Sequence, residues 1–221
     1  NYYFIFLIYM FEEIAIFYIS CFNYSRLWRP FLKLKEKYLC GNQIKLYLCT
    51  DKIPDSSDLR NIENEFKNVI ILEFNEVSDL DNNYFKRYLY YLKNIKENLI
   101  LYMYDDMFPS EHLKEDYLKE MIELLKNDKI KVIKTTTYNL PNNRKNIFHK
   151  NYLIFDNNND NYIISSQVHI IKKNIFIDLI NYCIKNFNRC GIKSGPNVFE
   201  VMGTEYFRNK DYIFLTVFNK N

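Results

Sequence analysis

Between residues 14 and 104 the chain alternates short, continuous apolar runs with segments whose apolar residues recur every three or four positions. The runs span residues 14–20, 44–50, 69–72 and 99–104. A continuous run of this length is typical of a strand buried on both faces. The spacing between runs is typical of an amphipathic helix, as at Leu27, Phe31, Leu34 and Tyr38. Strands that alternate with helices are joined by right-handed crossovers. The sequence therefore predicts an α/β, Rossmann-like fold with a mixed, mainly parallel sheet flanked by helices.

Similar patterns continue to the end of the chain in a less regular order. We expect helices around residues 59–66, 84–95, 118–125 and 175–184, and further strands at residues 131–134, 162–164 and 212–218. Residues 138–161 are rich in asparagine and charge, and they are expected to form loops with a hairpin. Neither a repeat nor a linker divides the chain, so residues 14–221 are predicted to form one domain.

Residues 1–13 are predicted to be an N-terminal extension or a truncated segment. Tyr2 to Phe11 are almost wholly apolar, but Glu12 and Glu13 follow before the apolar character resumes. A run of about ten residues is too short to span a bilayer, where roughly 20 are needed, and carboxylates near its centre would be costly. We therefore favour a core strand or an upstream extension over a membrane anchor, and we expect a cytoplasmic protein.

Several functional classes are excluded by composition. The chain has 4 glycines, and no Gly-rich phosphate loop of the Walker or dinucleotide type can be written. The net charge is +3 and the basic residues are scattered among acids, so no nucleic-acid partner is expected. The 5 cysteines form no CxxC pair, which argues against structural zinc. No GxSxG motif occurs, so a serine hydrolase of that kind is not expected.

The apolar run at residues 99–104 ends abruptly in Asp105 and Asp106. Open α/β sheets bind ligands beyond the carboxyl ends of their strands, where such acids would lie. Adjacent side chains of an extended strand point to opposite faces, so both acids can serve one site only if the backbone bends, as Pro109 suggests. One carboxylate could then hold Mg²⁺ or Mn²⁺. The alternatives are two solvated acids or the N-cap of the next helix.

Three further positions carry candidate chemistry, each with an ordinary alternative. Asp51 ends the second run, where it could accept hydrogen bonds from a base or a ribose, or form a turn before Pro54. His169 could act as a base or bind phosphate, although a histidine between Val168 and Ile170 is more often half-buried and satisfied. Glu200 is a candidate general base, or an ordinary surface acid.

In their order along the chain, several segments resemble the small GT-A-type glycosyltransferases of the family 2 kind. The segment from Tyr18 to Phe31 resembles their first strand and the helix that follows, and Leu46 to Asp51 is similar to their second strand. Residues 85–108 are similar to a helix and a strand that bears an acidic pair in place of Asp-x-Asp. The later matching segments are Ser165 to Lys173, Pro196 to Glu200, and Gly203-Thr204. The resemblance covers roughly residues 14–207.

This resemblance implies a glycosyltransferase that moves a sugar from a nucleotide-diphosphate donor to a hydroxyl of a glycan, lipid or protein. It implies that Asp106 holds Mn²⁺ or Mg²⁺, that Asp105 and Asp51 bind the donor, and that Glu200 is the catalytic base. Gln167 and His169 would line the acceptor or sugar pocket. Peripheral membrane association is compatible with such an acceptor. Ile171 and Asn197 stand where the family has aromatic residues, so the acceptor cannot be carried over.

Two other functions stay open at this point. The chain could be a degenerate, non-catalytic GT-A-like module that binds or interacts without turnover. A weaker alternative is a nucleotidyltransferase that uses the same acids and releases pyrophosphate from a nucleoside triphosphate.

Overall fold

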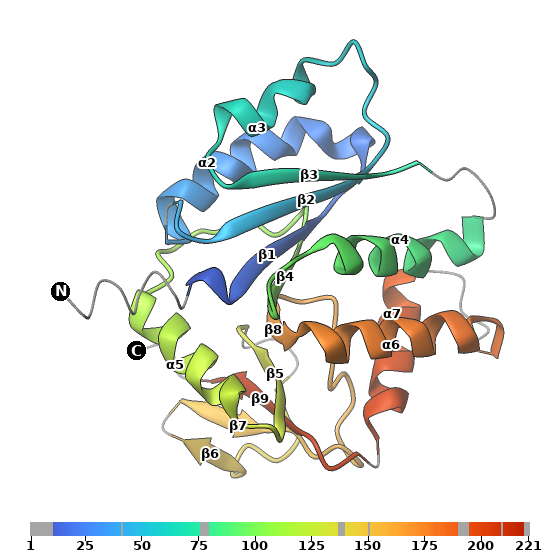
Figure 1. The fold of residues 1–221 in the computed structure, drawn as a ribbon. Coiled ribbons are helices and arrows are strands. Elements are labelled where there is room, and N and C mark those ends of the chain that lie inside the picture. Colours follow the sequence, from blue (N-terminus) through green and yellow to red (C-terminus); the bar gives the residue numbers. More distant parts are fainter. Residues whose placement is uncertain are drawn as a thin grey trace.

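The computed structural model describes residues 11–40, 42–75, 80–136, 140–149, 151–189, 195–208 and 210–218. Within this part of the chain, the strands form one mixed sheet in the order β3-β2-β1-β4-β8-β5-β9-β7-β6. Helices cover both faces of this sheet (Figure 1). The predicted α/β architecture is confirmed. The predicted segment of residues 1–13 is described only from Phe11 onward.

The first half of the sheet is parallel throughout, as predicted. Its strands are β1 (Ile14–Ile19), β2 (Lys45–Asp51), β3 (Val69–Phe74) and β4 (Leu99–Tyr104). The segments between them form the 3-10 turns η1 (Phe22–Leu27) and η2 (Asp58–Asn61) and the helices α2 (Trp28–Tyr38), α3 (Ile62–Glu65) and α4 (Leu80–Asn94). Each strand and α-helix lies where the sequence periodicity predicts it, within a few residues at its ends, whereas the turn η1 was not predicted.

The second half of the sheet changes direction at β8 (His169–Lys172), which pairs antiparallel with both β4 and β5 (Ile130–Lys134). Next comes β9 (Ile213–Val217), parallel to β5. The hairpin of β6 (Ile147–His149) and β7 (Tyr152–Ile154) completes the order and confirms the hairpin predicted between residues 138 and 161. The flanking elements are the helices α5 (Glu115–Lys126), α6 (Lys173–Asn186) and α7 (Gly195–Phe207) and the turn η3 (Phe187–Arg189).

The strand predicted at residues 162–164 is wrong. Ile163 and Ile164 are fully buried, but this segment has no regular secondary structure, and Tyr162 has a left-handed backbone with φ of 55°. Its apolar residues pack under α7, where a side chain added at Gly203 would come within 2.2 Å of Ile164 Cγ2. Burial against a helix therefore accounts for the apolar run without strand pairing. The strand of this region is β8, which begins at His169.

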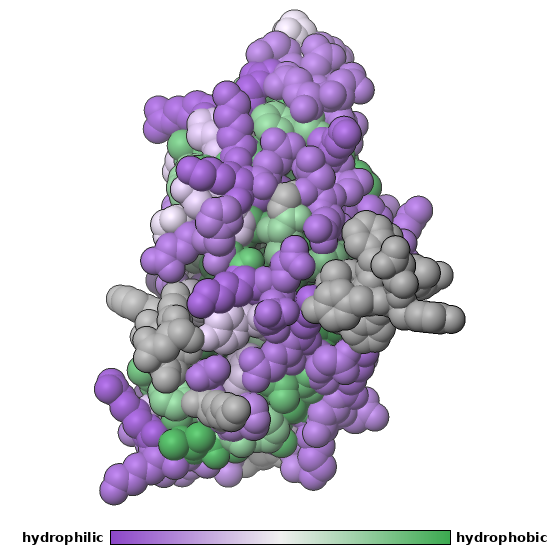
Figure 2. Space-filling model, turned by 90° about the vertical axis from the view of Figure 1, so that its left-hand side faces the viewer, coloured by the Kyte–Doolittle hydropathy of each residue, from purple (hydrophilic) through white to green (hydrophobic). Residues whose placement is uncertain are grey.

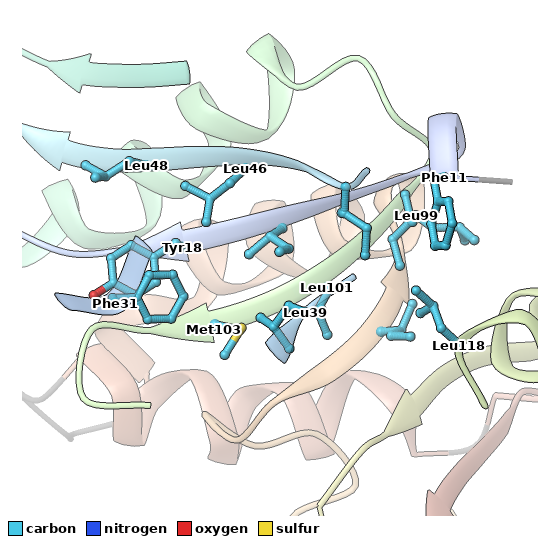
Figure 3. Close-up of a cluster of buried hydrophobic side chains, with 14 of the residues drawn as sticks. Phe11, Tyr18, Phe31, Leu39, Leu46, Leu48, Leu99, Leu101, Met103 and Leu118 are labelled. Atoms are coloured by element: carbon cyan, nitrogen blue, oxygen red, sulfur yellow. The ribbon is translucent and has the colours of Figure 1, made fainter. Parts of the chain in front are cut away.

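The sheet is buried on both faces, which explains why its first strands read as continuous apolar runs. One core contains Phe11, Tyr18, Phe31, Leu46 and Leu101 (Figure 3). The core on the other face includes Phe17, Tyr88, Tyr102, Phe176 and Phe199. Tyr18 stacks on Phe31 with ring centroids 3.9 Å apart, which joins β1 to α2.

The surface seen from the side of α5 is largely hydrophilic, with small apolar patches between the polar residues (Figure 2). In the described part of the chain, none of the helices is both long enough and apolar enough to cross a membrane.

Candidate functional site

Three parallel strands end side by side at one edge of the sheet and bring their following residues together. In the paired register, Ile19 of β1 lies opposite Cys49 of β2 and Tyr104 of β4. The residues just beyond these positions are Ser20, Asp51 and Asp105. This carboxyl edge is where open α/β sheets bind their ligands, and Asp51 lies at the same edge as the acidic pair.

Asp105 is held from two sides by residues of β1 and the turn that follows. Ser20 Oγ donates to Asp105 Oδ2 at 2.9 Å, and Tyr18 OH donates to the Asp105 carbonyl at 3.4 Å. Behind Ser20, the indole N–H of Trp28 donates to Ser20 Oγ at 2.8 Å. The carboxylate therefore lies in a fixed, partly buried position.

The two acids differ in their surroundings. Asp105 is partly buried, whereas Asp106 is exposed in the turn after β4. Burial raises the pKa of Asp105 above its ordinary value, the Ser20 hydrogen bond opposes that rise, and the neighbouring charge of Asp106 adds to it. The backbone bend that both acids need for a shared site is present as this turn.

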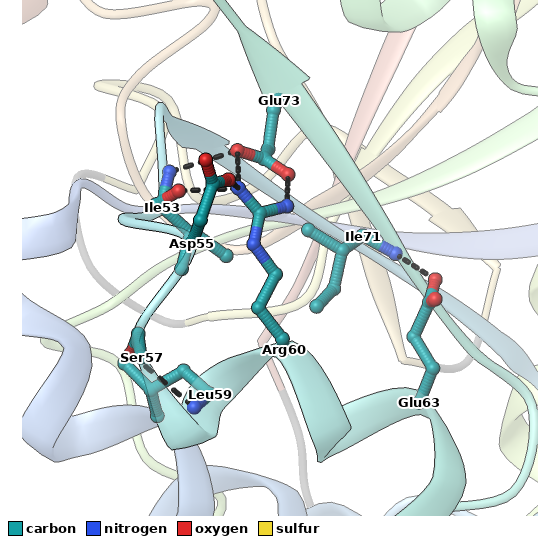
Figure 4. A network of polar contacts seen from close by, with 8 residues as sticks. All are labelled: Ile53, Asp55, Ser57, Leu59, Arg60, Glu63, Ile71 and Glu73. Carbon is teal, nitrogen blue, oxygen red and sulfur yellow. Dashed lines mark hydrogen bonds and ion pairs between the residues drawn. The ribbon is translucent and has the colours of Figure 1, made fainter.

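Asp51 joins the ends of β1 and β2. Its Oδ1 accepts hydrogen bonds from the backbone N–H of Phe22 and, at 3.0 Å, from Thr50 Oγ1. The following loop is fixed by Arg60, which pairs with Glu73 and donates to the Ile53 carbonyl (Figure 4). Asp51 therefore bonds across the sheet edge to the turn after β1, a contact that sequence reasoning did not foresee.

The reversed direction of β8 brings a second group of residues to the same edge. Tyr102 of β4 lies opposite His169 of β8, and the strands are antiparallel. The residues that precede β8 therefore lie beside those that follow β4. There the backbone N–H of Ser166 donates to Glu200 Oε1 at 2.8 Å. Glu200, on α7, is thus held at the edge that carries the acidic pair.

His169 is fully buried among aromatic rings, with Tyr102 at a centroid distance of 4.9 Å. Its Nδ1 lies 2.7 Å from the Gln167 carbonyl. Because a carbonyl only accepts, Nδ1 carries the proton and Nε2 is the acceptor nitrogen. Burial lowers the pKa of His169 to about 4, so the ring is neutral at pH 7. Among the described residues, Nε2 has no hydrogen-bond partner, and a hydroxyl donor would satisfy it. Gln167 itself is half-buried.

Lys134 is a buried cation that sequence reasoning missed. It ends β5 and is 1% exposed, between His169 of β8 and Thr216 of β9 in the sheet register. Its Nζ donates to the Tyr162 carbonyl at 3.2 Å and lies 5.0 Å from the centre of the Phe155 ring. Burial lowers the pKa of Lys134 to about 8, and the charge of Glu200 opposes that shift. A lysine at a strand end looks like an ordinary solvated residue in the sequence.

The described residues contain no group of three or more histidine, cysteine or acidic side chains arranged to hold a metal ion. The acidic pair nevertheless fits a cation that takes most of its ligands from elsewhere. Asp106 is exposed, and its charge adds to the raised pKa of Asp105, so a divalent ion would relieve this repulsion. Mg²⁺ is commonly bound by one or two carboxylates together with substrate phosphates.

A cavity of the protein lies away from the carboxyl edge of the sheet. Its volume is about 410 Å³, and it is lined at the opposite, amino end of β4 by residues that include Asn98, Leu99 and Lys173. None of the candidate residues lines it.

No protein-family model and no curated protein matches the sequence. Solved structures do match. TarS 1–349 from S. aureus is 13% identical with a TM-score of 0.55 over 93% of this chain. The same protein has been solved with UDP and with UDP-GlcNAc. The apo form of the glycosyltransferase GlyE from Streptococcus pneumoniae is 12% identical, with a TM-score of 0.54 over 92% of this chain.

A cytidylyltransferase from Leptospira borgpetersenii also matches, with 12% identity and a TM-score of 0.51 over 95% of this chain. The chain spans 60% of TarS 1–349, 44% of apo GlyE and 77% of the cytidylyltransferase. At such identities the likeness concerns the fold alone. The chain therefore has the fold of the GT-A-type nucleotide-sugar glycosyltransferases.

Proposed function

We propose that this protein is a glycosyltransferase that moves a sugar from a nucleotide-diphosphate donor to a hydroxyl acceptor with the help of Mn²⁺ or Mg²⁺. The observation that carries the proposal is that the acidic pair and a third acid, Glu200, lie at the same edge of the sheet. Asp105 and Asp106 follow β4, and Glu200 is bound to Ser166 just before the neighbouring, antiparallel β8. Similar structures solved with UDP and UDP-GlcNAc support a nucleotide-sugar donor.

In this proposal Asp106 holds the cation, and Asp105 and Asp51 position the donor. The bound cation would neutralise the charge that develops on the leaving diphosphate. Glu200 takes the proton of the acceptor hydroxyl, and the oxygen forms a bond to the anomeric carbon as the bond from that carbon to the diphosphate breaks. A single displacement of this kind inverts the anomeric centre. The acceptor is a glycan, a lipid or a protein hydroxyl.

Uncharged polar groups that could bind a hydroxyl-rich ligand lie on α7, in the segment before β8 and at the start of β8. His169 Nε2 and the hydroxyls of Ser165, Ser166 and Thr204 are buried without a hydrogen-bond partner among the described protein groups. Buried polar atoms of this kind cost roughly 1–3 kcal/mol each when unsatisfied. Sugar hydroxyls or ordered water would satisfy them. Gln167 and His169 are accordingly proposed to line the acceptor or sugar pocket.

The roles of the two acids separate in a donor-turnover assay with Mn²⁺. Asp106→Ala should abolish turnover of UDP- or other nucleotide-linked sugars, and Glu200→Gln should lose turnover while it keeps donor affinity. Matched controls are Asp128→Asn, at a fully exposed acid, and Glu205→Gln, which lies on the same helix and bonds Tyr182. Wild-type activity in Asp106→Ala would refute the metal role, and lost affinity with normal turnover in Glu200→Gln would refute the base.

A nucleotidyltransferase is the second candidate, because a cytidylyltransferase matches over 95% of this chain. It predicts release of pyrophosphate from CTP or another nucleoside triphosphate, which a coupled phosphate assay detects. Glycosyl transfer predicts release of a nucleoside diphosphate from the sugar donor and no pyrophosphate.

A non-catalytic module is separated from both enzymes by a thermal-shift screen. The screen uses UDP-, GDP- and CMP-linked sugars with and without Mn²⁺. A ligand present at 100 times its dissociation constant stabilises the native state by about 2.7 kcal/mol. A metal-dependent rise in melting temperature supports the enzyme, and no rise with any donor supports the module.

A further inference from the structure

We propose that Trp28 and Ser20 are positioning residues that fix the Asp105 carboxylate through a hydrogen-bonded relay, and that this relay couples Asp105 to the single tryptophan of the chain. The relay runs from the indole N–H of Trp28 to Ser20 Oγ at 2.8 Å, and from Ser20 Oγ to Asp105 Oδ2 at 2.9 Å. The donor-binding part of this inference rests on the proposed function; the relay itself does not.

The direction of the relay follows from the chemistry of its members. An indole N–H can only donate, so Ser20 Oγ must accept from Trp28. The serine hydroxyl then has its one hydrogen left for another acceptor. Asp105 Oδ2 at 2.9 Å is better placed than the Cys21 carbonyl at 3.4 Å, which is near the limit for a hydrogen bond. Asp105 must therefore present an unprotonated oxygen, and the relay is strongest when Asp105 is ionised.

Rigid elements hold every member of the relay. Trp28 is fully buried and begins α2, and Ser20 is 7% exposed immediately after β1. Tyr18 lies two residues before Ser20, so its side chain points to the same face, where it stacks on Phe31 and donates to the Asp105 carbonyl. Two residues at the end of β1 and two of α2 thus hold both the main chain and the carboxylate of Asp105.

The simpler explanation is that Ser20 only satisfies the buried indole N–H. In that case the hydroxyl could turn toward the Cys21 carbonyl, and the indole would not respond to the charge of Asp105. In the relay, loss of that charge weakens the bond from Ser20 and changes the polarity of the oxygen that the indole contacts. The two explanations therefore differ in how Trp28 responds to a neutral, isosteric change at Asp105.

The experiment uses the full chain labelled with ¹⁵N, in which the single tryptophan gives one indole N–H signal in the NMR spectrum. We expect Asp105→Asn and Ser20→Ala to move that signal strongly and Ser20→Thr, which keeps the hydroxyl, to restore it. The matched controls are Asp106→Asn, at the neighbouring acid, and Ser25→Ala, in the 3-10 turn between Ser20 and Trp28. If Asp105→Asn shifts the indole signal no more than the control variants do, the proposed relay is wrong.

The second measurement is the affinity of Ser20→Ala, Ser20→Thr and the control Ser25→Ala for UDP, GDP and CDP with Mg²⁺, by calorimetry. Loss of a hydrogen bond to a charged group predicts about tenfold weaker binding in Ser20→Ala, with near-wild-type binding in Ser20→Thr. Wild-type affinity in Ser20→Ala would refute the positioning role. If the indole responds to the substitutions but no nucleotide binds the wild type, the relay stands and the proposed donor fails. The melting temperature of each variant confirms that it is folded.

Discussion

The fold holds the Asp105 carboxylate where burial and the neighbouring Asp106 disfavour its charged form. It is partly buried beside Asp106, and burial raises its pKa. An acid whose pKa is higher in the folded than in the unfolded state stabilises the fold only where it is protonated, so Asp105 reduces the stability of the protein at neutral pH. Functional sites commonly keep such groups at the expense of stability.

We therefore predict that Asp105→Asn stabilises the protein at pH 7 by on the order of 1 kcal/mol, because the amide keeps an acceptor for Ser20 and removes the buried charge. Thermal unfolding at pH 7 and pH 4 measures the effect. The gain should shrink at the lower pH, where more of the wild-type carboxylate is protonated. Asp106→Asn, at the exposed acid, is the control and should have a smaller effect. Lower stability of Asp105→Asn at pH 7 would contradict this account.

His169 should make stability depend on pH in the acidic range. Its pKa in the folded protein is about 4, against 6.5 for an ordinary histidine. A base whose pKa is lowered by folding contributes fully above pH 6.5, and that contribution is lost as the pH falls toward 4 because the unfolded state takes up the proton first. Such a shift corresponds to about 3 kcal/mol.

The measurement is urea unfolding between pH 7 and pH 4 for wild type and His169→Gln. We expect the wild type to lose stability across this range and His169→Gln to show a flatter dependence, whatever its stability at pH 7. His149→Gln serves as the control because the His149 side chain is 52% exposed. Equal slopes for wild type and His169→Gln would show that the imidazole is not held neutral.

Sequence patterns identify which residue types could react, but they do not show what those residues touch. Asp105, Asp106 and Glu200 could be nominated as acids from their places in the chain. The supporting roles of Ser20 and Trp28 could not, because Ser20 contacts Asp105 across 85 residues and Trp28 acts only through Ser20. Lys134 was missed for a related reason. Whether a lysine at a strand end is solvated depends on the strands that flank it, and these are β8 and β9.

At the scale of elements, Glu200 depends on how closely α7 lies against the segment before β8. This segment follows the helix along its length, since Asn161 contacts Arg208, Ile164 packs on Gly203, and Ser166 binds Glu200. The contact at Gly203 admits no side chain, because a Cβ there would lie 2.2 Å from Ile164 Cγ2. The glycine therefore sets the spacing that lets Glu200 reach Ser166.

We predict that Gly203→Ala destabilises the protein by about 1–3 kcal/mol, the usual cost of overpacking a core. Because the displaced helix carries Glu200, turnover in the same variant should fall more than donor affinity. Val201→Ala is the matched control, since Val201 lies on the same helix and is 45% exposed. Chemical denaturation and the donor-turnover assay test both parts. Wild-type stability in Gly203→Ala would mean that α7 and Ile164 are not packed this closely.

Most helices and strands could be predicted because their signals are local. The periodicity of residues 14–104 reflects the burial of β1, β2 and β4 on both faces, and short crossovers join β1 to β2 and β2 to β3. The start of the strand between Tyr162 and His169 could not be predicted correctly. Buried residues under a helix and buried residues in a strand have the same apolar character. The antiparallel direction of β8 is a long-range property that no local pattern records.

At the scale of the whole molecule, two cores lie on opposite faces of one sheet, and each receives residues from both halves of that sheet. One contains Leu46 of β2 together with Leu215 of β9, and the other contains Phe17 of β1 together with Phe214 of β9. Neither half can expose its strands without opening both cores. The described part of the chain should therefore unfold as a single unit.

The prediction is one cooperative transition in urea at pH 7. Fluorescence of Trp28, which lies in the first core, and far-UV circular dichroism, which reports the whole backbone, should give coincident curves. A Trp28→Phe variant measured by dichroism alone checks that the curve does not depend on the probe. Two separate midpoints would show that the halves of the sheet unfold independently.

The position of β8 also determines where this cooperative unit is weakest. Among the described strands, it is the one that pairs with both β4 of the first half and β5 of the second, and it is only 4 residues long. Its first residue is the buried neutral His169, whose protonation would place an unpaired cation inside the sheet at this junction. In acid, protonation of His169 should therefore weaken the pairing of β8 with β4 and β5 first, and this junction should start the unfolding of the whole sheet.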